Sequence, residues 1–255
     1  MYTVCYKVYH HFCNMSIVFD RFFYVFLLKN DCFSFEKCFV FTRENPYSRM
    51  QVCIFHNLEV FMDNKKTGMN PILPGFYPDP SICRVNDDYY LVTSTFAYFP
   101  GVPIFHSRDL VHWNQIGNIL ERKEQLPLVN AETSEGIFAP TLRYHDGTFY
   151  MITTNVTPTN DINNFIVTAT DPAGPWSDPY PLDSAGIDPS LFFDDDDKVY
   201  VVYATGEMVQ LNSDLTAVVE GSHCRLFERD AEEKNLLEGS RMIKHDGKYY
   251  LLMIS

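Results

Sequence analysis

Three acidic residues, Asp79, Asp188 and Glu238, occupy matching positions in a pattern that recurs along the second part of the chain. Each is followed two places later by a serine, then by an apolar strand-like segment. A single Asp-Pro-Ser is more typical of a turn, so it is the repetition that favours a catalytic role. Carboxylates gathered in a poorly solvated place acquire different pKa values, because like charges repel. Glycoside cleavage needs such a set: one group donates a proton while another stays ionised.

The repeated pattern predicts the elements that must position these residues. Its first residue, here called the head residue, is followed by a strand, an acidic turn such as Asp146-Gly147, and a second strand with aromatic residues. Asp-Gly turns between runs of strand-forming residues are typical of β-hairpins. The heads are separated by 60, 49 and 50 residues, a period that favours four-stranded blades arranged radially. The four head residues are Asp79, Ala139, Asp188 and Glu238.

We therefore predict an all-β fold, a β-propeller of which residues 70–255 supply about three and a half blades. Aromatic residues make up 15% of the chain, which agrees with strands. The last repeat stops at Ser255 after its second strand, so the propeller is expected to be incomplete at its C-terminal end. A net charge of −13 argues against a nucleic-acid partner.

Residues 1–69 differ in composition from the rest of the chain. They carry 8 Lys/Arg against 6 Asp/Glu, whereas residues 70–255 hold 12 against 27. Their apolar run at residues 16–28 is interrupted by Asp20 and Arg21 and is too short to span a bilayer. The favoured interpretation is an over-extended reading frame with the true start at Met62 or Met69; the alternative is a poorly ordered or membrane-associated extension.

The remaining reactive residues are interpreted as structural. The acidic run Asp194–Asp197 aligns with hairpin turns, so a solvated turn is favoured over a metal site. The histidines lack metal-ligand spacing and are expected on the surface. Cys83 and Cys224 are expected to be isolated and reduced, which predicts a cytoplasmic location.

Together, these motifs resemble glycoside hydrolase family 43, particularly its β-xylosidase-like and α-L-arabinofuranosidase-like members. The similarity is clearest over residues 70–113, with support from residues 136–156 and 186–196. Residues 1–69 match nothing in that family. The resemblance implies a five-bladed propeller and an inverting single displacement on pentose sugars, with no redox cofactor required. A structural calcium ion at the propeller axis is the one metal that it allows, and no ligand for it can be assigned.

The resemblance also implies roles for named residues. Asp79 would be the general base that activates water, Asp188 would orient the acid and tune its acidity, and Glu238 would be the general acid. Phe96 and Phe138 would form an aromatic wall against the sugar, and Ala139 would be small because the sugar lies against it.

The sequence leaves several functions open. An exo-acting β-1,4-xylosidase acting on xylo-oligosaccharides is favoured, and an α-L-arabinofuranosidase acting on arabinose-substituted oligosaccharides is its close alternative. A non-catalytic carbohydrate-binding propeller or an inactive fragment is the alternative from another class. A fructosidase of a related propeller clan is disfavoured, because its Trp-Met-Asn-Asp-Pro-type motif is not found. No membrane partner is expected, and a homo-oligomer is compatible with the sequence.

Overall fold

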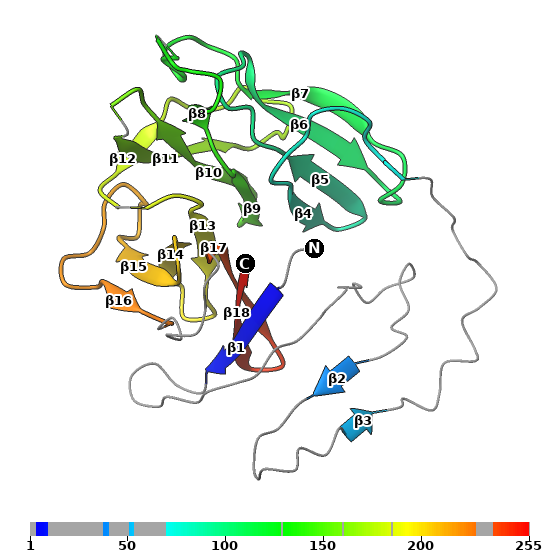
Figure 1. The fold of residues 1–255 in the computed structure, drawn as a ribbon, viewed down its shortest axis with the longest axis vertical. Coiled ribbons are helices and arrows are strands. Elements are labelled where there is room, and N and C mark those ends of the chain that lie inside the picture. The colour runs from blue at the N-terminus through cyan, green and yellow to red at the C-terminus, as the bar shows by residue number, and fades with distance from the viewer. Residues whose placement is uncertain are drawn as a thin grey trace.

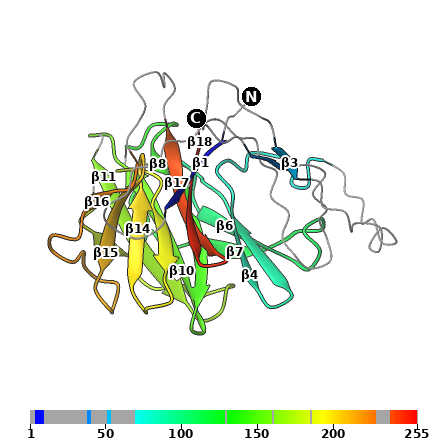
Figure 2. The same ribbon diagram turned by 90° about the horizontal axis from the view of Figure 1, so that it is seen from below.

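The computed structural model describes residues 70–128, 130–159, 161–184, 186–227 and 237–254, together with the backbone of three earlier strands. Every regular element in these ranges is a β-strand, so the all-β prediction is confirmed there. Four sheets are arranged around a common centre (Figure 1). In the view turned by 90°, the strands of these sheets lie roughly along one axis of the molecule (Figure 2).

All strand pairs in the first three sheets are antiparallel. The first sheet holds β4 (Ser81–Val85), β5 (Asp88–Val92), β6 (Gly101–Ser107) and β7 (Asn114–Leu120). The second holds β8 (Gly136–Ile137), β9 (Thr141–His145), β10 (Thr148–Val156), β11 (Ile162–Ala169) and β12 (Tyr180–Leu182). The third holds β13 (Ser190–Phe193), β14 (Val199–Tyr203), β15 (Glu207–Leu211) and β16 (Cys224–Arg225). In the first and third sheets the strands follow sequence order, whereas in the second both β8 and β9 pair with β10.

The fourth sheet contains β17 (Glu238–His245) and β18 (Lys248–Ile254). The backbone of β1 (Val4–Tyr9) pairs antiparallel with β18 and adds a third strand. A separate pair is formed by β2 (Cys38–Val40) and β3 (Gln51–Cys53). Other features expected within residues 1–69 lie outside the described residues.

The hydrophobic core lies between neighbouring sheets, and successive residues of one strand serve two different interfaces. On β10, Met151 packs between the first and second sheets, whereas Ile152 packs between the second and third. On β14, Val201 faces the second sheet and Val202 the fourth. Side chains of a strand alternate between its faces, so a sheet buried on both faces needs a continuous apolar run. This explains why the central strands read as unbroken runs of hydrophobic residues.

The hairpin turns form where the acidic pairs predicted them. Asp146 and Asp246 have φ values of 45° and 49°, and the glycine after each has φ of 80° or 72°. Two consecutive residues with positive φ make the turn that matches the twist of a hairpin. Because these turns end the innermost hairpins, they lie at the opposite end of each sheet from the head residues.

The acidic run in the third sheet corrects one expectation. Residues 195–197 are exposed as predicted, but Asp194 is buried rather than solvated. Its carboxylate accepts bonds from Lys244 Nζ at 2.6 Å and from the Tyr249 hydroxyl at 2.7 Å, both in the fourth sheet. Although burial raises the pKa of Asp194, these bonds outweigh it and hold the pKa below its ordinary value. Asp194 therefore joins two sheets.

Within the described residues, no helix has the length and apolar character needed to cross a bilayer. Cys83 is a buried free thiol.

Asp194→Asn is expected to destabilise the chain by about 1–3 kcal/mol, because it removes the charge that Lys244 and Tyr249 bind across the sheet interface. Urea unfolding monitored by circular dichroism at pH 7 measures the loss. The matched control is Asp197→Asn in the same turn, where the exposed residue has a φ of 63° that asparagine also tolerates. Equal losses in the two variants would contradict the role given to Asp194.

Candidate active site

The head residues gather at one end of the innermost strands. Asp79, Ala139 and Asp188 each lie two residues before such a strand, and Glu238 is the first residue of β17. The innermost strands contact one another in order, β4 with β9, β9 with β13, and β13 with β17. The repeat therefore brings together the residues that the sequence predicted to converge.

Asp79 is held by the end of the second strand of its own sheet. The Ser94 hydroxyl donates to Asp79 Oδ2 at 2.6 Å, and the Ser94 main-chain N–H donates to the carbonyl of Pro78 at 3.0 Å. Asp79 adopts a left-handed φ of 52°, which aspartate tolerates better than most residues. The sequence predicted a poorly solvated position, but Asp79 is exposed. One carboxylate oxygen is thus oriented by Ser94 on a residue that solvent reaches.

Asp188 repeats this backbone geometry but is buried. Its φ is 58°, and the Ala204 N–H donates to the carbonyl of Ile187 at 2.9 Å, as Ser94 does to Pro78 in the first sheet. Only 8% of Asp188 is exposed. Its side chain accepts a bond from the Gly239 main-chain N–H at 3.1 Å, which links the third and fourth sheets at their head residues.

Glu238 begins a β-bulge. Glu238 pairs with Ile254 and Arg241 with Leu252, so three steps along β17 match two along β18. An extra residue of this kind leaves backbone groups outside the ladder and re-aims side chains. Gly239 lies in the bulge with φ of 67°, where a side chain would be strained. Its main-chain N–H donates the hydrogen bond that the Asp188 carboxylate accepts.

Burial and charge act together on Asp188. Burial raises its pKa most, and the neighbouring Glu238 carboxylate raises it further. The positive charge of Arg241 lowers the pKa, Asp79 raises it by a smaller amount, and the hydrogen bond from the Gly239 N–H lowers it slightly. Together these effects raise the pKa of Asp188 to about 6. The sequence predicted that gathering these carboxylates would raise at least one pKa. The structure shows this at Asp188, with burial as the first cause.

Aromatic rings stand beside the carboxylates. The rings of Phe96 and Phe138 meet edge to face at 5.3 Å, and Phe76 lies 6.0 Å from Phe96. Phe96 and Ile137 exchange main-chain hydrogen bonds across the first and second sheets. A Cβ atom on Gly136 would lie 2.3 Å from the Phe96 carbonyl oxygen, so only glycine permits this approach. The structure thus brings together the two aromatic residues that the sequence singled out.

Ala139 is the head residue without a charge. It is 7% exposed, next to Phe138, whose N–H donates to the Thr154 carbonyl at 2.9 Å and whose carbonyl accepts from the Thr153 hydroxyl at 2.6 Å. The second sheet therefore contributes an apolar residue beside the aromatic pair rather than a fourth carboxylate.

Sequence reasoning missed three supporting residues. Ser94 lies within the first repeat, but its contact with Asp79 needs the hairpin to be folded. Asn164 is buried on β11 and donates to the carbonyl of Gly186 at 2.9 Å, which braces the loop before Asp188. Arg241 donates to the main-chain carbonyl of Asp188 at 3.3 Å. The only feature of the sequence that pointed to Arg241 was its position three residues after the acidic head Glu238.

The structure gives no support for a cation among these residues. Within the described ranges, no group of three or more His, Cys, Asp or Glu side chains is placed to hold a metal ion. The innermost strands instead carry the guanidinium groups of Arg143 and Arg241, which repel cations. Residues present here therefore do not fit a calcium ion. Of the histidines expected on the surface, His106 is partly buried and bonded to Asp88 at 2.6 Å, because it pairs across the first sheet.

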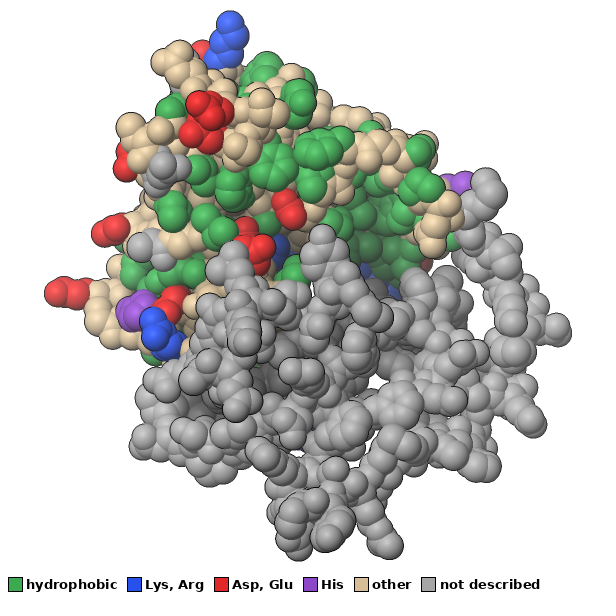
Figure 3. All heavy atoms as spheres, viewed as in Figure 1, with side chains coloured by type: hydrophobic (Ala, Val, Ile, Leu, Met, Phe, Trp, Pro, Cys, Tyr) green, Lys and Arg blue, Asp and Glu red, His purple; other side chains and the backbone are tan. Residues whose placement is uncertain are grey.

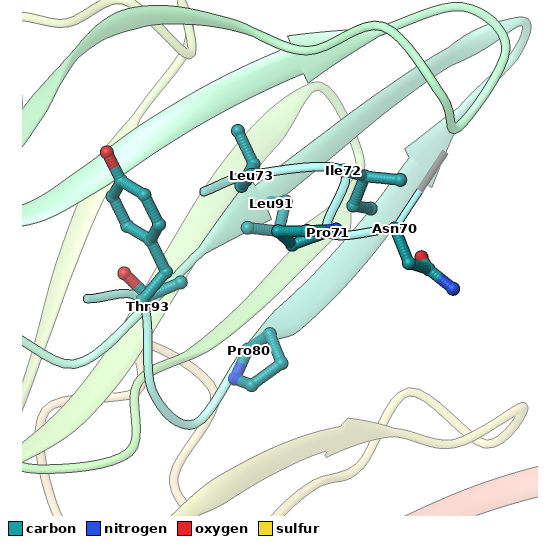
Figure 4. Close-up of a pocket in the computed structure, with 8 residues that line it drawn as sticks. Asn70, Pro71, Ile72, Leu73, Pro80, Leu91 and Thr93 are labelled. Atoms are coloured by element: carbon teal, nitrogen blue, oxygen red, sulfur yellow. The ribbon is translucent and has the colours of Figure 1, made fainter. Parts of the chain in front are cut away.

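On the described part of the surface shown in Figure 3, apolar side chains are interspersed with acidic ones. A separate hollow lies against the first sheet (Figure 4). None of the three acidic heads lines it, although Pro80 follows Asp79 directly. Its lining residues are Asn70, Pro71, Ile72, Leu73, Tyr77, Pro80, Leu91 and Thr93.

Asp188→Asn is expected to stabilise the chain at neutral pH. Between about pH 4 and pH 6, the unfolded chain loses the Asp188 proton while the folded chain retains it, so stability falls as the pH rises through this window. Well above pH 6 the penalty is complete, at about 3 kcal/mol. Urea unfolding should therefore show little difference between variant and parent at pH 4 and the full difference at pH 7.5. A difference independent of pH would contradict the assignment.

The family model described as glycosyl hydrolases family 43 matches residues 69–254. A xylosidase/arabinosidase of Butyrivibrio fibrisolvens is 53% identical over 198 residues, covering 72% of this chain and 38% of the relative. A non-reducing end α-L-arabinofuranosidase of Bacteroides ovatus is 58% identical over 132 residues, covering 51% of this chain and 25% of the relative.

Solved structures agree with the sequence comparisons. The crystal structure of a xylan β-1,4-xylosidase from Bacillus halodurans matches with a TM-score of 0.67 and 42% identity, covering 73% of this chain and 38% of that one. The chain thus spans less than two fifths of the length of these relatives. Because the family model covers most of the chain and includes all three acidic heads, the chain belongs to glycosyl hydrolases family 43.

Proposed function

We propose that the protein hydrolyses terminal β-1,4-linked xylose from xylo-oligosaccharides, with inversion at the anomeric carbon. The observation that carries this proposal is the meeting of Asp79, Asp188 and Glu238 at one end of the sheets, with one buried carboxylate of raised pKa among them. A set of carboxylates in unlike environments can divide acid and base roles between its members. Relatives named xylosidase/arabinosidase support the substrate class.

Each carboxylate receives a distinct role. Glu238 donates a proton to the glycosidic oxygen as the bond to the leaving sugar breaks. Asp79, exposed and oriented by Ser94, takes a proton from the water that attacks C1 from the opposite face. Inverting enzymes hold the two carboxyl groups roughly 6.5–9.5 Å apart, which leaves room for that water.

Asp188 acts on Glu238 rather than on the sugar. It binds the N–H of Gly239, next to Glu238, and therefore fixes the backbone on which the acid stands. The Glu238 carboxylate in turn raises the pKa of Asp188, so the two side chains interact electrostatically.

The aromatic pair and Ala139 form the wall against which the sugar lies. Phe96 and Phe138 present ring faces and edges of the kind that pack against the apolar face of a pentose. Ala139 leaves space beside them because its side chain is a single methyl group. These assignments rest on the geometry of the described residues and on family membership.

An α-L-arabinofuranosidase is the second candidate. The observation that favours it is the 58% identity with the Bacteroides ovatus α-L-arabinofuranosidase over 132 residues. Both sugars place similar hydroxyl groups near the scissile bond, so the same carboxylates serve either reaction.

We further infer that the complete propeller has five blades, of which the described residues supply the four radial sheets. A cytoplasmic location is part of the proposal and rests on the free thiol of Cys83. A homo-oligomer is compatible with it. No cofactor takes part in the proposed steps.

Glu238→Gln is expected to lower kcat by about 10²–10⁴-fold on xylobiose, because the leaving sugar needs protonation. The loss should be smaller on 4-nitrophenyl β-D-xylopyranoside, whose leaving group departs without a proton. Asp79→Asn should lose a similar factor on both substrates, since water must be activated in either case. Glu220→Gln, at an exposed position outside the site, is the control expected to keep the parent rates.

The same assays separate the alternatives. Faster hydrolysis of 4-nitrophenyl α-L-arabinofuranoside than of the xyloside would favour the second candidate. Proton NMR of the first product should show α-xylose, the inverted anomer. Parent rates no higher than those of Glu238→Gln on any substrate would exclude the enzyme assignment for this chain. Xylobiose binding by calorimetry would then distinguish a binding module from an inactive fragment.

A further inference from the structure

The β-bulge in β17 brings Arg241 to the same side of the fourth sheet as Glu238. In a regular strand, residues three apart point to opposite faces. Here Glu238 and Arg241 face Ile254 and Leu252 of β18, which are two apart and share one face. The extra residue therefore places an arginine on the same face as the proposed acid, farther along the innermost strand.

Arg241 is tied to the backbone of the site. Its Nη1 donates to the Asp188 carbonyl at 3.3 Å and to the Ser240 carbonyl at 3.3 Å. The bond to the Asp188 carbonyl links the fourth sheet to the third. The side chain of the same Asp188 accepts a hydrogen bond from the Gly239 N–H. Asp188 is therefore held by β17 at two points, its carboxylate and its carbonyl.

Main-chain carbonyls satisfy the hydrogen bonds of Arg241 but do not neutralise its charge. That charge acts on Asp188 and Asp79, and among the described residues the other cation that acts on it is Arg143 of β9. Burial first, and then Arg143, lower the pKa of Arg241 to about 10, while the two aspartates raise it. Arg241 thus remains protonated at neutral pH. Asp188 faces the carboxylates of Glu238 and Asp79 in addition to Arg241.

Arg143 has different partners. It donates to the Leu191 carbonyl at 3.1 Å and to the Ser190 hydroxyl at 3.2 Å. Its positive charge also interacts with the Cys83 side chain. It braces β9 against β13, whereas Arg241 contacts the head residue itself. The two half-buried arginines therefore have different roles.

We propose that Arg241 is a positioning residue for the three carboxylates, which holds the Asp188 turn against β17 and supplies the positive charge that offsets their mutual repulsion. This inference rests on the proposed function for its catalytic meaning, but its electrostatic content is independent of activity. Without the guanidinium, Asp188 would face two carboxylates and no cation beyond Arg143.

The direct test is a titration of Asp188 by NMR, with aspartate labelled with ¹³C at the carboxyl carbon and the resonance assigned by Asp188→Asn. In Arg241→Met, the pKa of Asp188 is expected to move upward by about one unit, because an opposite charge nearby is lost. Arg241→Lys should restore most of the parent value. Arg84→Met removes an arginine at the turn end of β4, where it bonds to the Asn86 carbonyl, and should leave the Asp188 titration unchanged.

Arg241→Gln keeps a hydrogen-bond donor for the Asp188 carbonyl but removes the charge. If Arg241→Met does not fold, the Asp188 titration is measured in Arg241→Gln instead. An unchanged Asp188 titration in a folded, uncharged variant would overturn the inference. Failure of Arg241→Lys to fold would also overturn it, because a charge role predicts rescue by lysine. Circular dichroism and urea unfolding report folding in each case.

Activity provides a separate readout. On 4-nitrophenyl β-D-xylopyranoside, the pH profile of kcat/KM for Arg241→Met is expected to be displaced to higher pH relative to the parent, with Arg241→Lys in between. If the Asp188 titration moves as expected while the parent hydrolyses no substrate, the proposed function fails and the role of Arg241 stands. If the parent is active and neither the titration nor the profile moves, the role of Arg241 fails and the function stands.

Discussion

The bulge at Gly239 is the constraint on which the arrangement of the site depends. It leaves the main-chain N–H of Gly239 outside the strand pairing, and this N–H donates a hydrogen bond to the Asp188 carboxylate at 3.1 Å. It also brings Glu238 and Arg241 to one face of β17, although they are three residues apart. Glycine is needed because the backbone there has a φ of 67°. One extra residue in a strand therefore sets the positions of an acid, its neighbour and a counter-charge.

The surrounding sheets hold this arrangement through buried hydroxyl groups two places after the head residues. Ser81 accepts the Leu142 N–H at 3.2 Å, Ser190 accepts a bond from Arg143, and Ser240 donates to the Ala204 carbonyl at 2.5 Å. Each bond crosses from one sheet to its neighbour. A buried hydroxyl without a partner is costly, so these serines favour one relative position of the sheets. The heads are thereby kept in place by the residues that follow them.

Sequence patterns predicted the parts of the site that depend on local structure. The convergence of the heads and the Asp-Gly turns follow from a repeat whose units fold alike. The pairing of Phe96 with Phe138 was expected from the family resemblance alone. Three features could not be read in this way: the exposure of Asp79, the burial of Asp194 and the inward turn of Arg241. Each depends on which side chains a neighbouring sheet presents. The bulge is a further case, since Glu-Gly-Ser is compatible with a regular strand start as well as with an extra residue.

Asp188 and Asp194 show how position alone divides stability from chemistry. Both are buried aspartates at opposite ends of one strand, β13, and both contact the fourth sheet. At the turn end, a lysine and a tyrosine bind Asp194, and the pKa falls despite burial. At the head end, Asp188 has one backbone N–H and a guanidinium that bonds to its carbonyl rather than to its carboxylate, and the pKa rises. A charge that is fully paired stabilises the sheet interface, whereas a charge left partly unpaired can still exchange its proton. The fold therefore places the ion pair of Asp194 with Lys244 away from the head residues and keeps the incompletely neutralised carboxylate where the proposed reaction needs it.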